Sequence, residues 1–357
     1  MASSKSKAPK INVPPDYQLH DIDEKLGAPS TDRDSNQTPP LGVLDHFTGT
    51  FAGKGFNMIF RPNSNPPTTT TFQNPVNPPP PTGQSENVLQ LSLTTENLAF
   101  SPPLGNVPNR GLQEQNDIFL NGVPYVQSIN DVTNTATGKG DGPANPIHFE
   151  PGLWMHVPAT NDFPVLGETL NRMASIPHGT TINAQGLAPT ASIAGPPIFS
   201  PVDITPFLST GTQSANPIRF IAQTAARTDT PRLPQDLTKF MAEGTITQEI
   251  LDDPNTILKN DNIGKNITST IVFKVATTPD GPVFGGGTDN IAFLQGGSGA
   301  GRPNANVTKM ESTFWISTVQ QELVVPPFKP GEVSQIMTYG IPVAVYAPIS
   351  PRSSILT

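Results

Sequence analysis

Four side chains that could do chemistry recur at even-numbered positions of one short segment, HFEPGLWMH. They are His148, Glu150, Trp154 and His156. An unbroken strand would direct all four to one face, because side chains alternate along a strand. A neutral imidazole on that face can act as a general base, and a neighbouring carboxylate can orient it. We expect the Pro-Gly pair after Glu150 to interrupt the strand, and a polar strand with one buried, hydrogen-bonded histidine is the alternative.

Two further polar residues follow in the segment NRMASIPHGTT. An inward Arg172 in a barrel would suit a ligand carboxylate through bidentate hydrogen bonds. An outward, solvated Arg172 is the other interpretation. His178 falls in a predicted turn, where it would either reach a ligand at a barrel mouth or remain solvated.

Aromatic residues complete the set that we predict to contact a ligand. The full set is Phe51, Phe60, His148, Trp154, His156, Arg172, His178 and Trp315. Aromatic side chains could line a cavity, but they also fill the core of any all-β protein. No catalytic set emerges, because the chain has no G-x-S-x-G motif and no cysteine. Whether the protein is an enzyme stays open, and we predict no metal.

The composition limits the elements that can hold these residues. The 357 residues include 42 prolines and 30 glycines, which excludes long helical bundles. Charged residues make up 14% and the net charge is −8, so neither a nucleic acid nor an anionic membrane is the expected partner. The sequence begins without an apolar secretory core and contains no long apolar run, and we expect a cytoplasmic protein without a membrane partner.

The chain is punctuated by segments rich in proline and polar residues. We predict an extended or disordered arm over residues 1–40 and a β-barrel domain over 41–325. Pro-rich insertions are expected at 61–85 and 187–260, the second of which carries two short helices in a lid-like arrangement. Residues 326–357 are predicted to form a C-terminal extension.

Short strands separated by turn residues fill the rest of the domain, which is typical of an antiparallel sandwich or barrel. The pair Asn121-Gly122 separates DIFL from VPYVQS. Both residues tolerate positive φ, so the pair predicts a two-residue hairpin turn.

Four motifs in order resemble the nitrobindin-like heme-binding β-barrels. They are FTGTFAGKG, DIFLNGVPYVQSINDVT, HFEPGLW and RMASIPHGTTINAQG. The resemblance implies an all-β, lipocalin-like antiparallel closed barrel of about ten strands, with a heme in its mouth and a histidine from a late strand on the iron. The late segment NVTKMESTFWISTV contains no histidine. The resemblance therefore implies the fold more directly than the heme, whose ligand would have to be His148, His156 or His178.

These observations lead to one preferred function and two alternatives. We expect the barrel to bind a hydrophobic small molecule inside it, without a cofactor. The first alternative is a heme protein with peroxidase-like or nitric-oxide-related activity. The second is a structural, self-assembling protein whose terminal arms make a homo-oligomer.

Overall fold

A computed structural model gives the fold of the second of two units into which the chain divides, residues 1–38 and 39–357. The structure describes residues 39–62, 87–111, 116–161, 165–176, 179–202, 237–279, 285–291, 306–307, 309–325, 335–347 and 353–354. Within these ranges, the side chains of residues 60–62, 87–90, 306, 321–325, 335–347 and 353–354 are outside the description. The predicted arm over 1–40 and the predicted insertion over 61–85 lie almost wholly outside the described residues.

Most of the described residues belong to one antiparallel sheet that curls into a half-barrel. Its main path is β1 (Thr50–Pro62), β2 (Asn87–Phe100), β4 (Ile118–Asp131), β5 (Asn145–Val157), β6 (Thr169–Ser175), β7 (Thr180–Leu187), β9 (Ile267–Ala276), β12 (Glu311–Val325) and β13 (Gln335–Ala347). Short strands β3 (Val107–Asn109), β8 (Ile193–Ala194) and β10 (Gly287–Asn290) join it, and β11 (Asn306–Val307) pairs with β14 (Ser353–Ser354).

The structure confirms the predicted mainly antiparallel β fold with few helices. Among the described residues, β1 pairs only with β2 and β13 only with β12, so no ladder closes the sheet there. A closed barrel of about ten strands therefore stays a prediction. Strand β13 falls within the predicted C-terminal extension and continues the sheet beyond β12.

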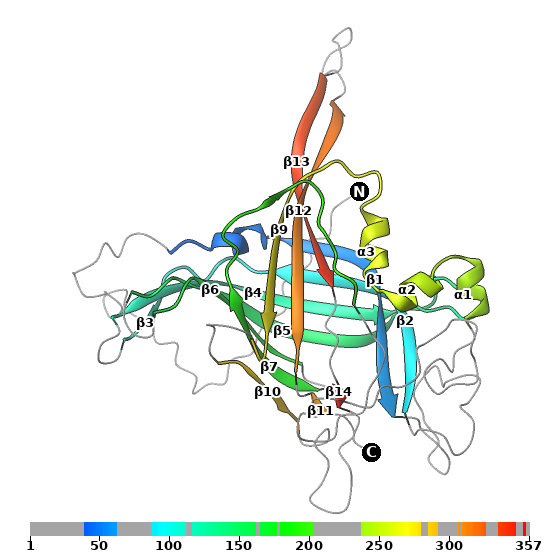
Figure 1. The fold of residues 1–357 in the computed structure, drawn as a ribbon, viewed down its shortest axis with the longest axis horizontal. Coiled ribbons are helices and arrows are strands. Elements are labelled where there is room, and N and C mark those ends of the chain that lie inside the picture. Colours follow the sequence, from blue (N-terminus) through cyan, green and yellow to red (C-terminus); the bar gives the residue numbers. More distant parts are fainter. Residues whose placement is uncertain are drawn as a thin grey trace, which may run out of the picture. The chain divides into compact units, whose positions relative to one another are not determined.

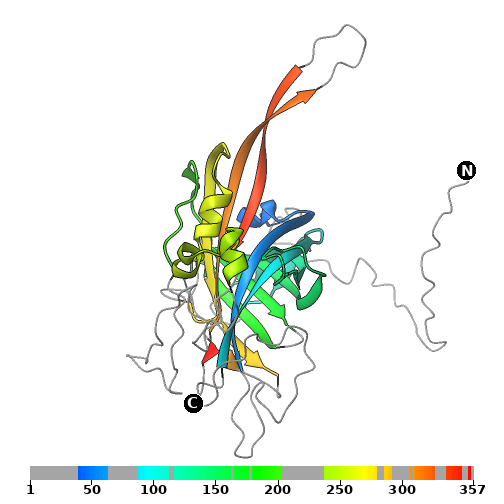
Figure 2. The same ribbon diagram turned by 90° about the vertical axis from the view of Figure 1, so that its right-hand side faces the viewer.

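The core lies between the two arms of the curled sheet. In Figure 1 the strands β9, β12 and β13 cross in front of β1, β2, β4 and β5, and Figure 2 shows the same two layers from the side. Trp154 on β5 meets Phe314 on β12 with ring centroids 5.1 Å apart. Phe47, which follows the short 3-10 helix η2 (Gly42–His46), stacks on Phe100 at 4.7 Å. Aromatic rings therefore fill this part of the concave face.

Strand β7 shows how the sequence creates a concave face. Its residues TTINAQGL alternate strictly between buried and exposed or half-buried positions. Ile182 and Ala184 point into the core and their neighbours point outward. This period of two is what one buried face of a sheet requires.

The pair Asn121-Gly122 does not form the predicted hairpin turn; it lies in the middle of β4. The Asn121 amide donates to the Pro39 carbonyl at 2.8 Å, and its side-chain oxygen accepts from the Gly105 amide at 3.1 Å. A Cβ atom on Gly122 would overlap the carbonyl oxygen of Trp154. The glycine is thus explained by the close approach of β5 rather than by a turn.

The expected interruption at Pro151 and Gly152 is also wrong, because β5 pairs with β4 through both residues. A Cβ atom on Gly152 would meet the Tyr125 ring at about 2.5 Å. The missing side chain gives the ring of Tyr125 room to lie across β5. The irregularity in this ladder lies instead between Ile129 and Asn130, before His148 is reached.

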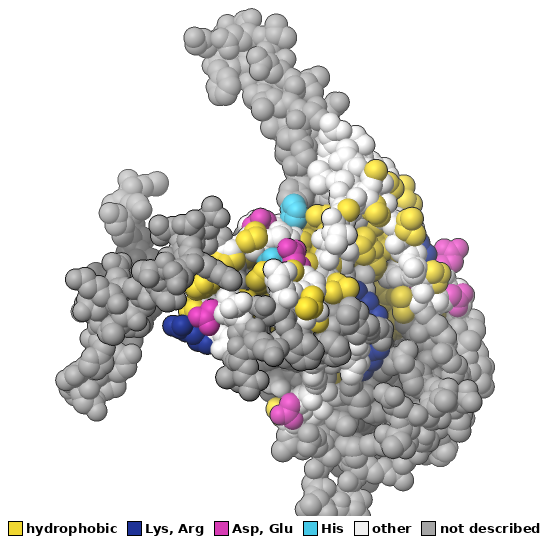
Figure 3. Space-filling model, turned by 60° about the vertical axis from the view of Figure 1, so that its left-hand side comes forward, with side chains coloured by type: hydrophobic (Ala, Val, Ile, Leu, Met, Phe, Trp, Pro, Cys, Tyr) yellow, Lys and Arg dark blue, Asp and Glu magenta, His cyan; other side chains and the backbone are white. Residues whose placement is uncertain are grey.

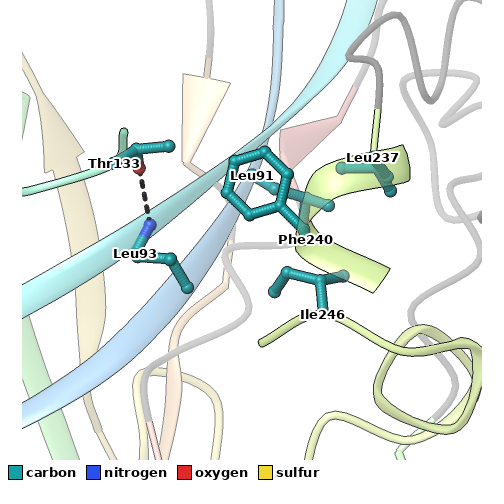
Figure 4. Close-up of a pocket in the computed structure, with 6 residues that line it drawn as sticks. All are labelled: Leu91, Leu93, Thr133, Leu237, Phe240 and Ile246. Carbon is teal, nitrogen blue, oxygen red and sulfur yellow. Dashed lines mark hydrogen bonds between the residues drawn. The ribbon is translucent and has the colours of Figure 1, made fainter. Parts of the chain in front are cut away.

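Where it is described, the predicted helical insertion contains three helices rather than two: α1 (Thr238–Ala242), α2 (Gln248–Asp252) and α3 (Thr256–Asp261). Phe240 and Ile246 pack against Leu91 and Leu93 on the outer face of β2. Figure 4 shows the small apolar pocket that these side chains leave beside Leu237. The helices therefore cover the outer face of the sheet, and the described part of the insertion does not lie over the concave face as a lid.

Candidate functional site

A buried ion pair lies at the centre of the concave face. Glu150 on β5 is fully buried and Arg172 on β6 is 2% exposed. The Nη2 atom of Arg172 donates to Glu150 Oε1 at 2.6 Å. Side chains alternate along β5 and β6. This alternation places Glu150 and Arg172 on the face of the sheet that carries Trp154. Arg172 thus has the inward orientation.

The guanidinium of Arg172 is satisfied by the protein itself. Its Nε donates to the Tyr125 hydroxyl at 2.9 Å and its Nη1 donates to Ser312 Oγ at 2.9 Å. Nη2 also donates to Gln127 Oε1 at 3.4 Å. Every nitrogen of the group therefore has a protein acceptor, so a ligand carboxylate would have to displace Glu150 to reach it.

These contacts change the ionisation of the two acids in the cluster. Burial alone would raise the pKa of Glu150, but the Arg172 charge and hydrogen bonds from His148 and Tyr125 outweigh it and lower the pKa to about 2. Burial raises the pKa of Tyr125 well above its ordinary value. At neutral pH Glu150 is therefore an anion and the Tyr125 hydroxyl is a hydrogen-bond donor to it.

His148 connects this cluster to the more open part of the concave face. Its side chain is 19% exposed, and Nε2 lies 3.1 Å from Glu150 Oε2. The next acid, Glu96 on β2, accepts from Gln127 Nε2 and Thr94 Oγ1, each at 3.4 Å. Burial raises the pKa of Glu96, opposed by these two hydrogen bonds and by His148. Glu96 is thus a half-buried carboxylate whose two hydrogen bonds are both long.

The two β1 positions beside Glu96 on the concave face are glycines, Gly53 and Gly55. Gly53 pairs directly with Glu96, and Phe51 pairs with Leu98. A Cβ atom at Gly53 would meet no described atom within 4 Å, and one at Gly55 would meet Thr94 Oγ1 at 3.4 Å and Glu96 Oε1 at 3.5 Å. We call Phe51, Gly53, Gly55, Glu96 and Leu98 the β1–β2 floor. It is a surface with half-buried apolar groups at one end and a carboxylate in the middle.

The structure brings together five of the residues predicted to contact a ligand and separates others. Phe51, His148, Trp154, His156 and Arg172 share the concave face. Trp315 is buried on the opposite face of β12, where its ring meets Phe199 at 4.9 Å. His178 and the side chain of Phe60 lie outside the described residues.

His156 sits at the far end of β5 from His148. Its side chain is 2% exposed, and Nε2 lies 3.6 Å from the Glu168 carboxylate. Neither ring nitrogen makes a hydrogen bond within the described residues. A Cβ atom on Gly42 would lie 3.5 Å from Nε2, so the η2 backbone packs over this ring.

Sequence reasoning missed most of the polar partners of Arg172 and all of the floor except Phe51. Tyr125 and Gln127 stand two residues apart in VPYVQS, and Thr94 and Glu96 two residues apart in LTTEN. Such alternation of polar residues along a strand was the available signal. It could not show which strand would lie beside which.

The comparisons with known proteins leave the site to be interpreted from its own geometry. No family model matches the chain, and neither a curated protein nor a solved structure proved similar to it. The nitrobindin-like resemblance therefore stays a prediction, as does a cytoplasmic location. None of the helices within the described ranges is long and apolar enough to cross a membrane.

The two described histidines that could ligate a heme are both in contact with other groups. Nε2 of His148 is engaged by Glu150, and the ring of His156 is covered by Gly42. Where the structure is described, no three histidine or acidic side chains converge on a point that could hold a metal ion. Heme binding stays a prediction.

Proposed function

We propose that the protein binds a small, mainly apolar molecule on the β1–β2 floor, without a metal or a cofactor. The observation that carries the proposal is the cross-strand pairing of Phe51 with Leu98 next to that of Gly53 with Glu96. Protein sites for small molecules are usually apolar surfaces with a few placed polar groups. The floor combines both in one short stretch of two strands.

The floor differs from the rest of the concave face in having room. Around Trp154, the rings of Phe47 and Phe314 fill the space between the layers. At Gly53, by contrast, no described atom would contact an added Cβ. We therefore expect the ligand to lie along β1 and β2, and its apolar part to contact Phe51 and Leu98. If the sheet closes into a complete barrel, the same floor would line its interior.

The buried Arg172–Glu150 pair has a supporting role in this proposal. Arg172 donates to Gln127, which in turn donates to Glu96. Glu150 holds His148 in the same way. A polar surface held by such a network is preorganised, so less freedom is lost when a ligand binds.

Filling the floor with a side chain tests the proposal. The probe is N-phenyl-1-naphthylamine, a neutral apolar molecule whose fluorescence rises in an apolar site. We expect saturable binding to the full chain and at least about a tenfold loss of affinity in Gly53→Leu, since the new side chain occupies the space of the ligand.

The matched control is Ala52→Leu, which places the same side chain at the next position of β1. Ala52 is exposed and pairs with Asn97 on the other face of the sheet. Its variant should bind the probe as the native chain does. Equal affinity of native protein and Gly53→Leu, with circular dichroism showing both folded, would overturn the proposal, and so would the lack of saturable binding to the native chain.

A further inference from the structure

We propose that the ligand of the β1–β2 floor carries an ammonium group that pairs with Glu96. This inference rests on the proposed function and narrows its ligand to amphipathic amines. It is the opposite of what an inward arginine in a barrel suggests, namely a ligand carboxylate. On the concave face Arg172, His148 and Glu150 are already paired, whereas the carboxylate of Glu96 borders open space.

The cations of this face are already engaged. Arg172 donates to Glu150, Tyr125 and Ser312, and it is almost completely buried. His148 lies against Glu150 at 3.1 Å. A carboxylate on the floor would therefore find no available counter-charge among the described residues and would face Glu96 instead.

Lys54 does not change this balance. It stands between Gly53 and Gly55 in the sequence and pairs with Thr95, so it belongs to the opposite face of β1. Its side chain is exposed there. The sequence thus places a cation next to the floor along the chain but on the other side of the sheet, because side chains alternate.

Glu96 is the acid that borders the open part of the floor. Its strand partner is Gly53, which has no side chain to cover it, and its Oε1 faces the position of a Gly55 Cβ at 3.5 Å. Its two hydrogen bonds are long, at 3.4 Å each. A half-buried carboxylate in this state gains most from a charged donor, because charge-assisted hydrogen bonds are shorter and stronger than neutral ones.

The other acids facing this region are already satisfied. Glu150 is held by Arg172, and Asp131 on β4 accepts from the Thr133 amide at 2.8 Å. The apolar end of the floor, Phe51 and Leu98, then accommodates the hydrocarbon part of the amine. Charge and apolar surface together fit a primary alkylammonium ion.

Calorimetric titration of the full chain with three ligands of equal length tests the inference. The ligands are dodecylammonium, dodecanol and dodecanoate, each below its micelle concentration at neutral pH. We expect dodecylammonium to bind about tenfold or more tightly than dodecanol, and dodecanoate to bind most weakly. In Glu96→Gln, a substitution of the same shape, the advantage of the ammonium ion should disappear.

The matched control is Glu249→Gln, which removes the same charge from an exposed position on α2. It should leave the order of the three ligands unchanged. A preference for dodecanoate, equal binding of all three, no binding of dodecylammonium, or an unchanged preference in Glu96→Gln would each overturn the inference. The proposed function is tested separately, by titrating the neutral probe into Gly53→Leu and Ala52→Leu, so failure of one proposal can be told from failure of the other.

Discussion

At the scale of single residues, the concave face is organised by one ion pair that the protein keeps for itself. Taking both charges out of water costs free energy, which the bond between Arg172 and Glu150 and its surrounding hydrogen bonds offset. The sequence indicated that Glu150 could orient a histidine, and it does contact His148. The sequence did not reveal Arg172 as the main partner of Glu150, because the two residues are 22 positions apart and meet only through the pairing of β5 with β6.

Removing the charge of Glu150 should destabilise the fold strongly. In Glu150→Gln the guanidinium of Arg172 stays buried without its counter-charge, and we expect a loss of about 3–5 kcal/mol in the free energy of unfolding at pH 7. Urea denaturation measures it. Glu168→Gln is the control, because that side chain is 57% exposed and should change stability by less than about 0.5 kcal/mol. A loss in Glu150→Gln no larger than in the control would refute the account of the ion pair.

The same pair predicts a dependence on pH. The pKa of Glu150 is lowered from 4.5 to about 2, so its stabilisation is present above the ordinary value and is lost as the pH falls through the lowered one. The stability difference between the native chain and Glu150→Gln should therefore shrink between about pH 4.5 and pH 2. A difference that stays constant over this range would show that folding does not lower the pKa of Glu150.

At the scale of elements, the alternation of side chains along strands was predictable from the sequence, but the structural role of each glycine was not. The mainly antiparallel β fold and the helical insertion follow from periodicity and turn residues. The pairs at Asn121 and at Pro151 were interpreted as a turn and a break, yet both lie inside strands. Their glycines permit contacts with Trp154 and Tyr125, and such contacts depend on neighbouring strands that a single segment of sequence does not specify.

Substitution by alanine should therefore change stability by different amounts at glycine positions that look alike in the sequence. Gly122→Ala should lower the free energy of unfolding by about 2 kcal/mol or more, because the new Cβ would overlap the backbone of β5. Gly53→Ala should cost less than about 0.5 kcal/mol, because no described atom lies within 4 Å of its Cβ. Thermal or urea unfolding of both variants tests this, and similar losses in the two would contradict the register between β4 and β5.

At the scale of the whole described unit, the two faces of the sheet have separate tasks. The concave face carries the aromatic core and the floor, and the outer face of β1 and β2 carries the helices. Charged residues make up 14% of the chain, and Figure 3 shows hydrophobic side chains gathered over the described part of one side. Phe149 is 49% exposed and Val126 is 41% exposed on the outer face of the sheet.

Self-assembly through the terminal arms stays a prediction, since residues 1–38 lie outside the description.

The separation of the faces has a measurable consequence. Phe240→Ala removes a ring that is 3% exposed between α1 and β2, and we expect it to cost about 3–5 kcal/mol of stability. The affinity for N-phenyl-1-naphthylamine should not change under conditions where the variant is folded. A parallel loss of probe binding would place the ligand in the pocket of Figure 4 rather than on the floor.

The most direct test of ligand binding on the β1–β2 floor is to locate a bound probe by nuclear magnetic resonance. Protein labelled with 15N-glycine would be titrated with N-phenyl-1-naphthylamine, and the amide signals of Gly53 and Gly55 identified by their loss in alanine variants. We expect these two signals to shift saturably, while those of Gly244 and Gly264 near the helices stay in place. Saturable binding that leaves Gly53 and Gly55 unperturbed would contradict the assignment of the floor as the binding site.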